Sequence, residues 1–138
     1  TEMMARAIEE GLVQGGARVK VMSMHSSHRS DAAYEILDAG ALVAGSPTLN
    51  NHIFPSMADV LTYLKGLRPQ NLIGAAFGSY GWSGESPQQI ADILTEMKVE
   101  LVAEPLKMKY VPHGDDLKRC VSLGESVARK LKEVAQRG

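Results

Sequence analysis

Two segments of the sequence combine residue types that suit the binding of a flat, uncharged ring. Residues 46–51 (SPTLNN) and 78–85 (GSYGWSGE) are rich in small and polar residues, and neither contains a basic residue. Glycine allows a backbone to approach a ring edge and offer its N–H donors. Trp82, the only tryptophan, could cover a ring face, which adds about 0.5–1.5 kcal/mol to the burial of its area. The alternative is that both segments are ordinary turns and that Trp82 is a surface anchor.

The histidines and the cysteine give little support for metal or nucleophilic chemistry. His25 and His28 are three residues apart, as in some metal pairs, but no carboxylate motif accompanies them, so a solvated loop is the better interpretation. We interpret His52 as a surface residue beside the first segment rather than a redox group. Cys120 falls within the apolar stripe of a helix and is expected to be a small core residue. The sequence therefore predicts no catalytic side chain and no metal site.

An alternation of helices and strands positions the two segments. Apolar residues spaced three or four apart predict five helices, which begin at Thr1, Ser30, Ser56, Ser86 and Gly114. Wholly apolar or alternating runs predict strands at 18–22, 41–45, 71–77 and 99–111, the last broken by Pro105. The two segments follow the second and third of these strands. In an open α/β sheet a ligand binds outside the carboxyl ends of the strands, so both segments belong at that edge.

Two local patterns refine these elements. Ser86, Pro87 and Gln89 predict a helix N-cap, a first-turn proline and a capping-box partner. Lys107 and Lys109 alternate with apolar residues in the last predicted strand, and lysines on one face are typical of an edge strand.

The order of the elements predicts an α/β fold with a doubly wound parallel sheet. Every predicted strand is followed by a helix, which favours helices on both faces of the sheet. We predict the strand order 2-1-3-4-5, in which the first strand lies inside the sheet. The first helix here has no strand before it. We therefore expect residues 1–138 to form one domain that is incomplete at its N-terminal side.

The composition excludes several classes of function. The chain has 138 residues, 44% of them apolar, with 15 lysines and arginines against 16 aspartates and glutamates. A formal net charge of −1 gives no basic footprint for nucleic acid. No apolar run approaches the roughly 18 residues of a membrane span, and no leader pattern opens the sequence. We expect a cytoplasmic domain.

Longer stretches of the sequence resemble a known family. The motifs GSPTLNN at 45–51, FP at 54–55, YLKGL at 63–67 and AAFGSYGWSGE at 75–85 resemble the flavodoxin-like domain of flavodiiron proteins, the A-type flavoproteins. The resemblance covers essentially the whole chain. It implies a flavodoxin-like fold and FMN as the cofactor. It also implies electron transfer from rubredoxin or a rubredoxin-type reductase to a diiron centre that reduces oxygen or nitric oxide.

The resemblance also implies which residues hold the flavin. Two loops line the ring, with Trp82 expected to stack on it and Tyr80 as the second choice. Thr1 is all that the chain carries of the phosphate loop, which belongs at a helix N-terminus because free N–H groups attract an anion there. The implied flavin-binding residues are Thr1, Ser46, Pro47, Thr48, Leu49, Asn50, Asn51, Gly78, Ser79, Tyr80, Gly81, Trp82, Ser83 and Gly84.

Partners and alternatives follow from the same resemblance. The diiron ligands belong to a separate metallo-β-lactamase-like domain, and the full-length proteins of the family are homo-oligomers. A stand-alone flavodoxin or an FMN-dependent quinone reductase is the alternative. The net charge of −1 disfavours a diffusing carrier, which needs a strong steering field. A phospho-receiver domain is rejected because Ser46 stands where it needs an aspartate.

Overall fold

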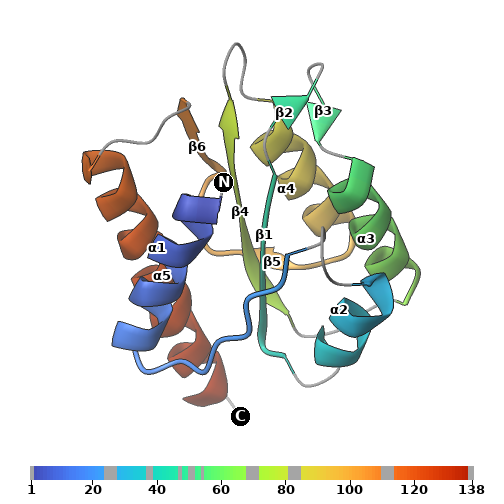
Figure 1. Ribbon diagram of the computed structural model, residues 1–138. Coiled ribbons are helices and arrows are strands. Elements are labelled where there is room, and N and C mark those ends of the chain that lie inside the picture. Colours follow the sequence, from blue (N-terminus) through green and yellow to red (C-terminus); the bar gives the residue numbers. More distant parts are fainter. Residues whose placement is uncertain are drawn as a thin grey trace.

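The structure, a computed structural model, describes residues 2–23, 28–36, 39–46, 48–49, 52–53, 55–67, 72–80, 85–109 and 114–136. Its helices are α1 (Glu2–Gln14), α2 (Arg29–Ile36), α3 (Pro55–Gly66), α4 (Ser86–Glu96) and α5 (Gly114–Gln136). Its strands are β1 (Ala41–Gly45), β2 (Thr48–Leu49), β3 (His52–Ile53), β4 (Ile73–Tyr80), β5 (Glu100–Leu101) and β6 (Leu106–Lys109). Helices α1 and α5 cover one face of the sheet, and α3 and α4 lie on the other side (Figure 1).

The central strand of the sheet is β4, which is apolar and buried from Ile73 to Ser79. It pairs in parallel with β1 on one side, with Ala41 opposite Ile73 and Gly45 opposite Phe77. On the other side it pairs in parallel with β5 and, further along, with β6. A strand buried on both faces is expected to be continuously apolar. The predicted parallel α/β architecture is confirmed, whereas the complete strand order 2-1-3-4-5 is still a prediction.

Two hydrophobic clusters hold the layers together, one on each face of the sheet. The cluster under α1 and α5 includes Met4, Ile8, Phe77 and Val127, and the cluster under α3 and α4 includes Leu61, Leu64, Ile90 and Leu94. Glycine allows α1 and α5 to approach each other closely. A Cβ atom on Gly11 would lie 2.0 Å from the carbonyl oxygen of Val121, and one on Gly124 would lie 2.1 Å from that of Ile8.

The predicted strand at 18–22 is wrong for this structure. Residues 17–23 are described, and they form neither a strand nor a ladder with any described strand. In the order 2-1-3-4-5 this segment would lie two places from β1, with the first strand between them. No described strand fills that place, and none pairs with residues 18–22.

The last predicted strand is divided. Residues 102–105 interrupt it, leaving β5 and β6 on either side, as expected from Pro105, which has no N–H group to donate to a ladder. Both pieces still pair with β4. In β6, Lys107 and Lys109 are exposed while Met108 is 2% exposed, so the prediction of an edge strand is confirmed.

Within the described ranges, no helix is both long enough and apolar enough to cross a membrane.

Candidate functional site

The segments after β1 and β4 begin at the same edge of the sheet, because these parallel strands end side by side. The N–H of Ser46 donates a hydrogen bond to the carbonyl oxygen of Phe77 at 3.3 Å, which extends the β1–β4 ladder beyond Gly45. The first segment then forms a small antiparallel pair, with Thr48 opposite Ile53 and Leu49 opposite His52. Figure 1 shows β2 and β3 at the upper end of the sheet, near the end of β4.

A buried hydrogen bond joins the first segment to the start of α4. The hydroxyl group of Ser86 donates to the carbonyl oxygen of Ser46 at 2.8 Å, and both side chains are at most 1% exposed. The prediction that Ser86 is the N-cap is wrong, because that position is taken by Glu85. The hydroxyl group instead makes a long-range contact between the first turn of α4 and the segment that follows β1.

Gly78 allows this contact to form. A Cβ atom at that position would lie 2.3 Å from the carbonyl oxygen of Ser46 and 2.8 Å from the hydroxyl oxygen of Ser86. Distances below about 3 Å are not found for real Cβ atoms, so any other residue would push the two segments apart. Glycine at this position thus keeps the loop after β1, strand β4 and helix α4 in close contact at the edge of the sheet.

Three of the predicted loop residues belong to a strand instead. Gly78, Ser79 and Tyr80 extend β4 and pair with Lys107, Met108 and Lys109 of β6. The predicted strand ended at Phe77 because glycine and serine are poor strand formers, but pairing with β6 extends the ladder. Ser79 is buried and Tyr80 is partly buried.

The structure brings together part of the predicted binding set. Ser46, Gly78, Ser79 and Tyr80 lie at the carboxyl end of the sheet, and the backbones of Thr48 and Leu49 follow in β2. The other predicted residues lie outside the described residues: Thr1, Pro47, Asn50, Asn51, Gly81, Trp82, Ser83 and Gly84.

Glu85, the last residue of the second segment, is not among the predicted flavin-binding residues. It is the N-cap residue of α4, and its side chain makes no capping hydrogen bond. Its Oε2 atom is buried without a hydrogen-bond partner. A carboxylate is favoured near a helix N-terminus. No sequence signal could reveal the burial of this one oxygen, since it depends on packing between distant segments.

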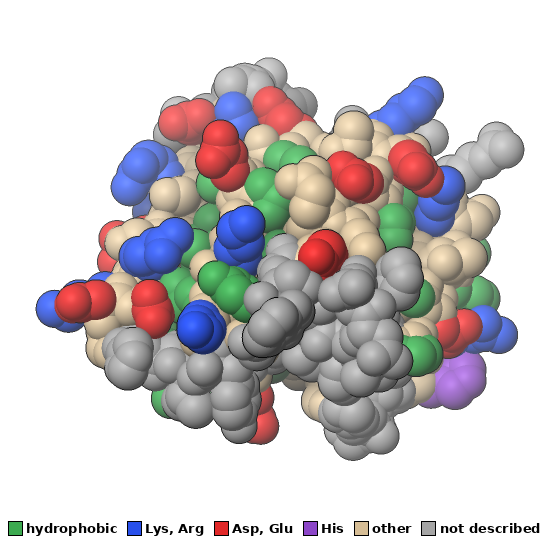
Figure 2. Space-filling model, turned by 90° about the horizontal axis from the view of Figure 1, so that it is seen from above, with side chains coloured by type: hydrophobic (Ala, Val, Ile, Leu, Met, Phe, Trp, Pro, Cys, Tyr) green, Lys and Arg blue, Asp and Glu red, His purple; other side chains and the backbone are tan. Residues whose placement is uncertain are grey.

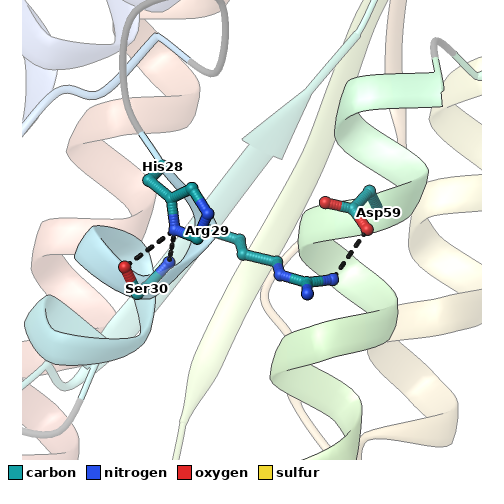
Figure 3. Close-up of polar contacts among 4 residues, drawn as sticks. All are labelled: His28, Arg29, Ser30 and Asp59. Atoms are coloured by element: carbon teal, nitrogen blue, oxygen red, sulfur yellow. Dashed lines mark hydrogen bonds and ion pairs between the residues drawn. The ribbon is translucent and has the colours of Figure 1, made fainter.

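The histidine that could have suggested a metal pair caps a helix instead (Figure 3). The N–H of Ser30 donates to Nδ1 of His28 at 3.1 Å, and the N–H of His28 donates to Asp31 at 3.0 Å. Next to it, Arg29 of α2 forms an ion pair of 3.0 Å with Asp59 of α3 and lies over the ring of Tyr63. Among the described residues there is no group of side chains that could hold a metal ion.

Cys120 is a core residue, as predicted. It is fully buried, and its Sγ atom lies 3.8 Å from Sδ of Met108. Desolvation by burial raises the pKa of its thiol to about 11. The thiol is therefore protonated at neutral pH and unsuited to act as a nucleophile.

Known proteins match the chain along most of its length. Residues 1–124 match the sequence profile of the family Flavodoxin. A nitric oxide reductase of Moorella thermoacetica is 46% identical over 134 residues, which are 96% of this chain and 34% of that protein. A rubredoxin-oxygen oxidoreductase of Megalodesulfovibrio gigas is 48% identical over 132 residues, which are 96% of this chain and 33% of that protein. The chain thus spans about a third of the length of these relatives.

Solved structures give the same result. The rubredoxin oxygen:oxidoreductase of Desulfovibrio gigas superposes with a TM-score of 0.96 at 47% identity, over 98% of this chain and 34% of that one. An archaeal flavodoxin superposes with a TM-score of 0.87 at 35% identity, over 96% of this chain and 90% of that one. The fold, the edge of the sheet that carries the two segments and these matches lead to one conclusion: the chain belongs to the flavodoxin family.

Proposed function

We propose that this chain binds FMN and passes electrons from rubredoxin or a rubredoxin-type reductase to a diiron centre on a separate metallo-β-lactamase-like domain. The match to the rubredoxin oxygen:oxidoreductase of Desulfovibrio gigas, at 47% identity and a TM-score of 0.96, carries this proposal. That match covers 34% of the enzyme, and in this proposal the diiron centre that reduces oxygen or nitric oxide lies in a domain outside the matched part.

FMN is the cofactor that membership of the flavodoxin family implies, and the described residues fit it. Gly78 and Ser46 hold the segments after β1 and β4 together where α/β folds bind their ligands. Both segments lack a basic residue, which suits the neutral ring. Helix α1 begins at Glu2 and provides a helix N-terminus for the phosphate.

In this proposal the side chains bind and orient the cofactor, and none acts as an acid or base. FMN supplies reversible one- and two-electron chemistry, whereas the protein sets its position and its electrostatic surroundings. Residues 46–51 line one side of the ring and residues 78–84 line the other, with Trp82 stacked on it. The buried Ser46–Ser86 hydrogen bond ties the first segment to the start of α4.

The cofactor can be identified directly. We expect protein purified from cells to be yellow and to release FMN, and no dinucleotide, when it is denatured and the extract is separated by chromatography. FAD in the extract would contradict the proposal. Protein that stays colourless after incubation with FMN would contradict it as well.

Replacing Trp82 by alanine tests the stacking residue. We expect FMN affinity to fall by about 1–3 kcal/mol, because both buried area and stacking are lost. The emission of the remaining bound flavin should rise, since a stacked indole quenches it. Tyr34→Ala is the control, because Tyr34 is an aromatic residue of α2 that is 72% exposed. If Trp82→Ala binds and emits like the control, Trp82 does not stack.

The wider setting belongs to the same proposal. Residues 1–138 act as one module of a homo-oligomeric, cytoplasmic flavodiiron protein. The alternative is a stand-alone flavodoxin, which is favoured by the 90% coverage of the archaeal flavodoxin. The mass of the natural polypeptide detected in cell extract distinguishes the two, because a flavodiiron protein is about three times as long as this chain.

A further inference from the structure

Two lysines lie beside the proposed flavin site and form no ion pair with any described residue. Lys107 and Lys109 are exposed residues of β6, which pairs only with β4 in the described sheet. Of the lysines in the described ranges, Lys65, Lys118 and Lys130 form ion pairs, whereas Lys107 and Lys109, like Lys20, Lys98 and Lys132, form none with a described residue. An exposed charge without an oppositely charged neighbour adds to the electrostatic potential at the protein surface.

The register of the sheet places both lysines next to the second segment. Lys107 is opposite Gly78, and Lys109 is opposite Tyr80, the last residue before 81–84. Residues opposite each other in a ladder share a face of the sheet. That face is the one where Gly78 meets Ser86 and Pro87 of α4, whereas Met108 points the other way and contacts Cys120 of α5.

Figure 2 shows lysine and arginine side chains, with acidic side chains among them, on the side of β6 and α5. The cationic surface is narrow, because the first turn of α5 carries Asp115 and Asp116, and Lys118 forms an ion pair with Asp115 at 3.9 Å.

We infer that Lys107 and Lys109 form a docking surface for an electron-donor protein with an acidic face. The inference rests on the proposed function, and it identifies the side from which the donor approaches. Complementary charge steers two proteins together and raises the association rate by about 10- to 1,000-fold at low salt. Each reduced donor molecule gives up one electron. Two such electrons, together with two protons from water, fully reduce one flavin.

The test is stopped-flow reduction of the FMN-loaded protein by a reduced rubredoxin of measured negative net charge. We expect the second-order rate constant to fall steeply as salt is raised, because charges further apart than a Debye length of about 8–10 Å are screened. The double variant Lys107→Glu/Lys109→Glu should be at least about tenfold slower at low salt and nearly independent of salt. The variant Lys107→Gln/Lys109→Gln should lie between it and the parent.

Lys98→Glu is the matched control. Lys98 is exposed and precedes β5, whose residue Glu100 pairs with Ile73 at the start of β4, so it lies at the opposite end of the sheet. The same change of charge there should alter the rate less than about twofold, since it acts only through net charge. FMN content and photoreduction of each variant are measured in parallel and should be unchanged.

The possible outcomes separate the two proposals. If rubredoxin does not reduce the parent protein although light does, the proposed donor is wrong. If rubredoxin reduces the parent at a rate that depends neither on salt nor on the two lysines, the proposed donor is supported and the proposed docking surface is wrong. An equal loss of rate in Lys98→Glu also contradicts the docking surface. In that case the lysines only protect the sheet edge against pairing with another chain.

Discussion

Replacing Gly124 by alanine is expected to lower the free energy of unfolding by about 3 kcal/mol, the upper end of the usual cost of overpacking. The new Cβ atom would lie 2.1 Å from the carbonyl oxygen of Ile8 and 2.8 Å from the backbone nitrogen of Leu12. Backbone atoms cannot rotate away as the end of a side chain can. Helices α1 and α5 must therefore separate, which loosens the cluster that contains Ile8, Leu12 and Val127.

Gly66→Ala is the control for this prediction. Gly66 lies at the end of α3, and a Cβ atom there would meet nothing within 4 Å. Alanine should stabilise the protein slightly there, by up to about 1 kcal/mol, because it loses less conformational freedom on folding. Urea unfolding of the two variants and the parent measures both effects. If Gly124→Ala is within about 0.5 kcal/mol of the parent, α1 and α5 do not approach as closely as described.

The sequence could predict helices α1 and α5 but not how closely they approach each other. Periodic apolar residues such as Leu117, Val121 and Val127 reveal that α5 has a buried face. In the same pattern Gly11 and Gly124 look like weak points within helices, because glycine is a poor helix former. Their value appears only when a second helix, more than 100 residues away in the sequence, contacts the same position.

The candidate site shows the same division between local and long-range information. The edge of the sheet was predictable from the order of strands and helices and from the glycine-rich segments that follow β1 and β4. The part played by Ser86 was not, because a serine before a proline has the local pattern of an N-cap. Its hydrogen bond to Ser46 spans 40 residues, and the orphan oxygen of Glu85 likewise depends on tertiary packing.

Strand β1 has one edge that no described strand covers. In the β1–β4 ladder, Gly40 accepts from Ile73 and Ser46 donates to Phe77, so alternate residues of this stretch face β4. The backbone groups of Ala41, Val43 and Gly45 therefore point away from β4. No described strand pairs with them. These three residues are half-buried, and a buried polar group without a partner costs about 1–3 kcal/mol.

We expect the amides of Val43 and Gly45 to exchange with solvent at least about a hundredfold faster than those of Leu42 and Ala44 in the 138-residue chain. The reason is that opening is nearly free at unpaired groups but approaches the global stability of ~5–15 kcal/mol in central ladders. Hydrogen exchange followed by NMR measures each amide separately. Sedimentation at the same concentration provides the control, because a second copy pairing with this edge would protect the amides and double the mass.

If a further strand pairs with this edge of β1, hydrogen exchange should become slow in two segments together. It would pair with β1 on one side and, in the order 2-1-3-4-5, with residues 18–22 on the other. Ala17 and Val19 already pack against the cluster under α1 and α5, so residues 17–23 lie against the core without a ladder to join. We therefore expect slow exchange at Val43 and Gly45 to appear only together with slow exchange at 18–22. Slow exchange at Val43 and Gly45 in a monomer whose residues 18–22 exchange rapidly would show that the edge is closed in another way, and that no interior strand is missing.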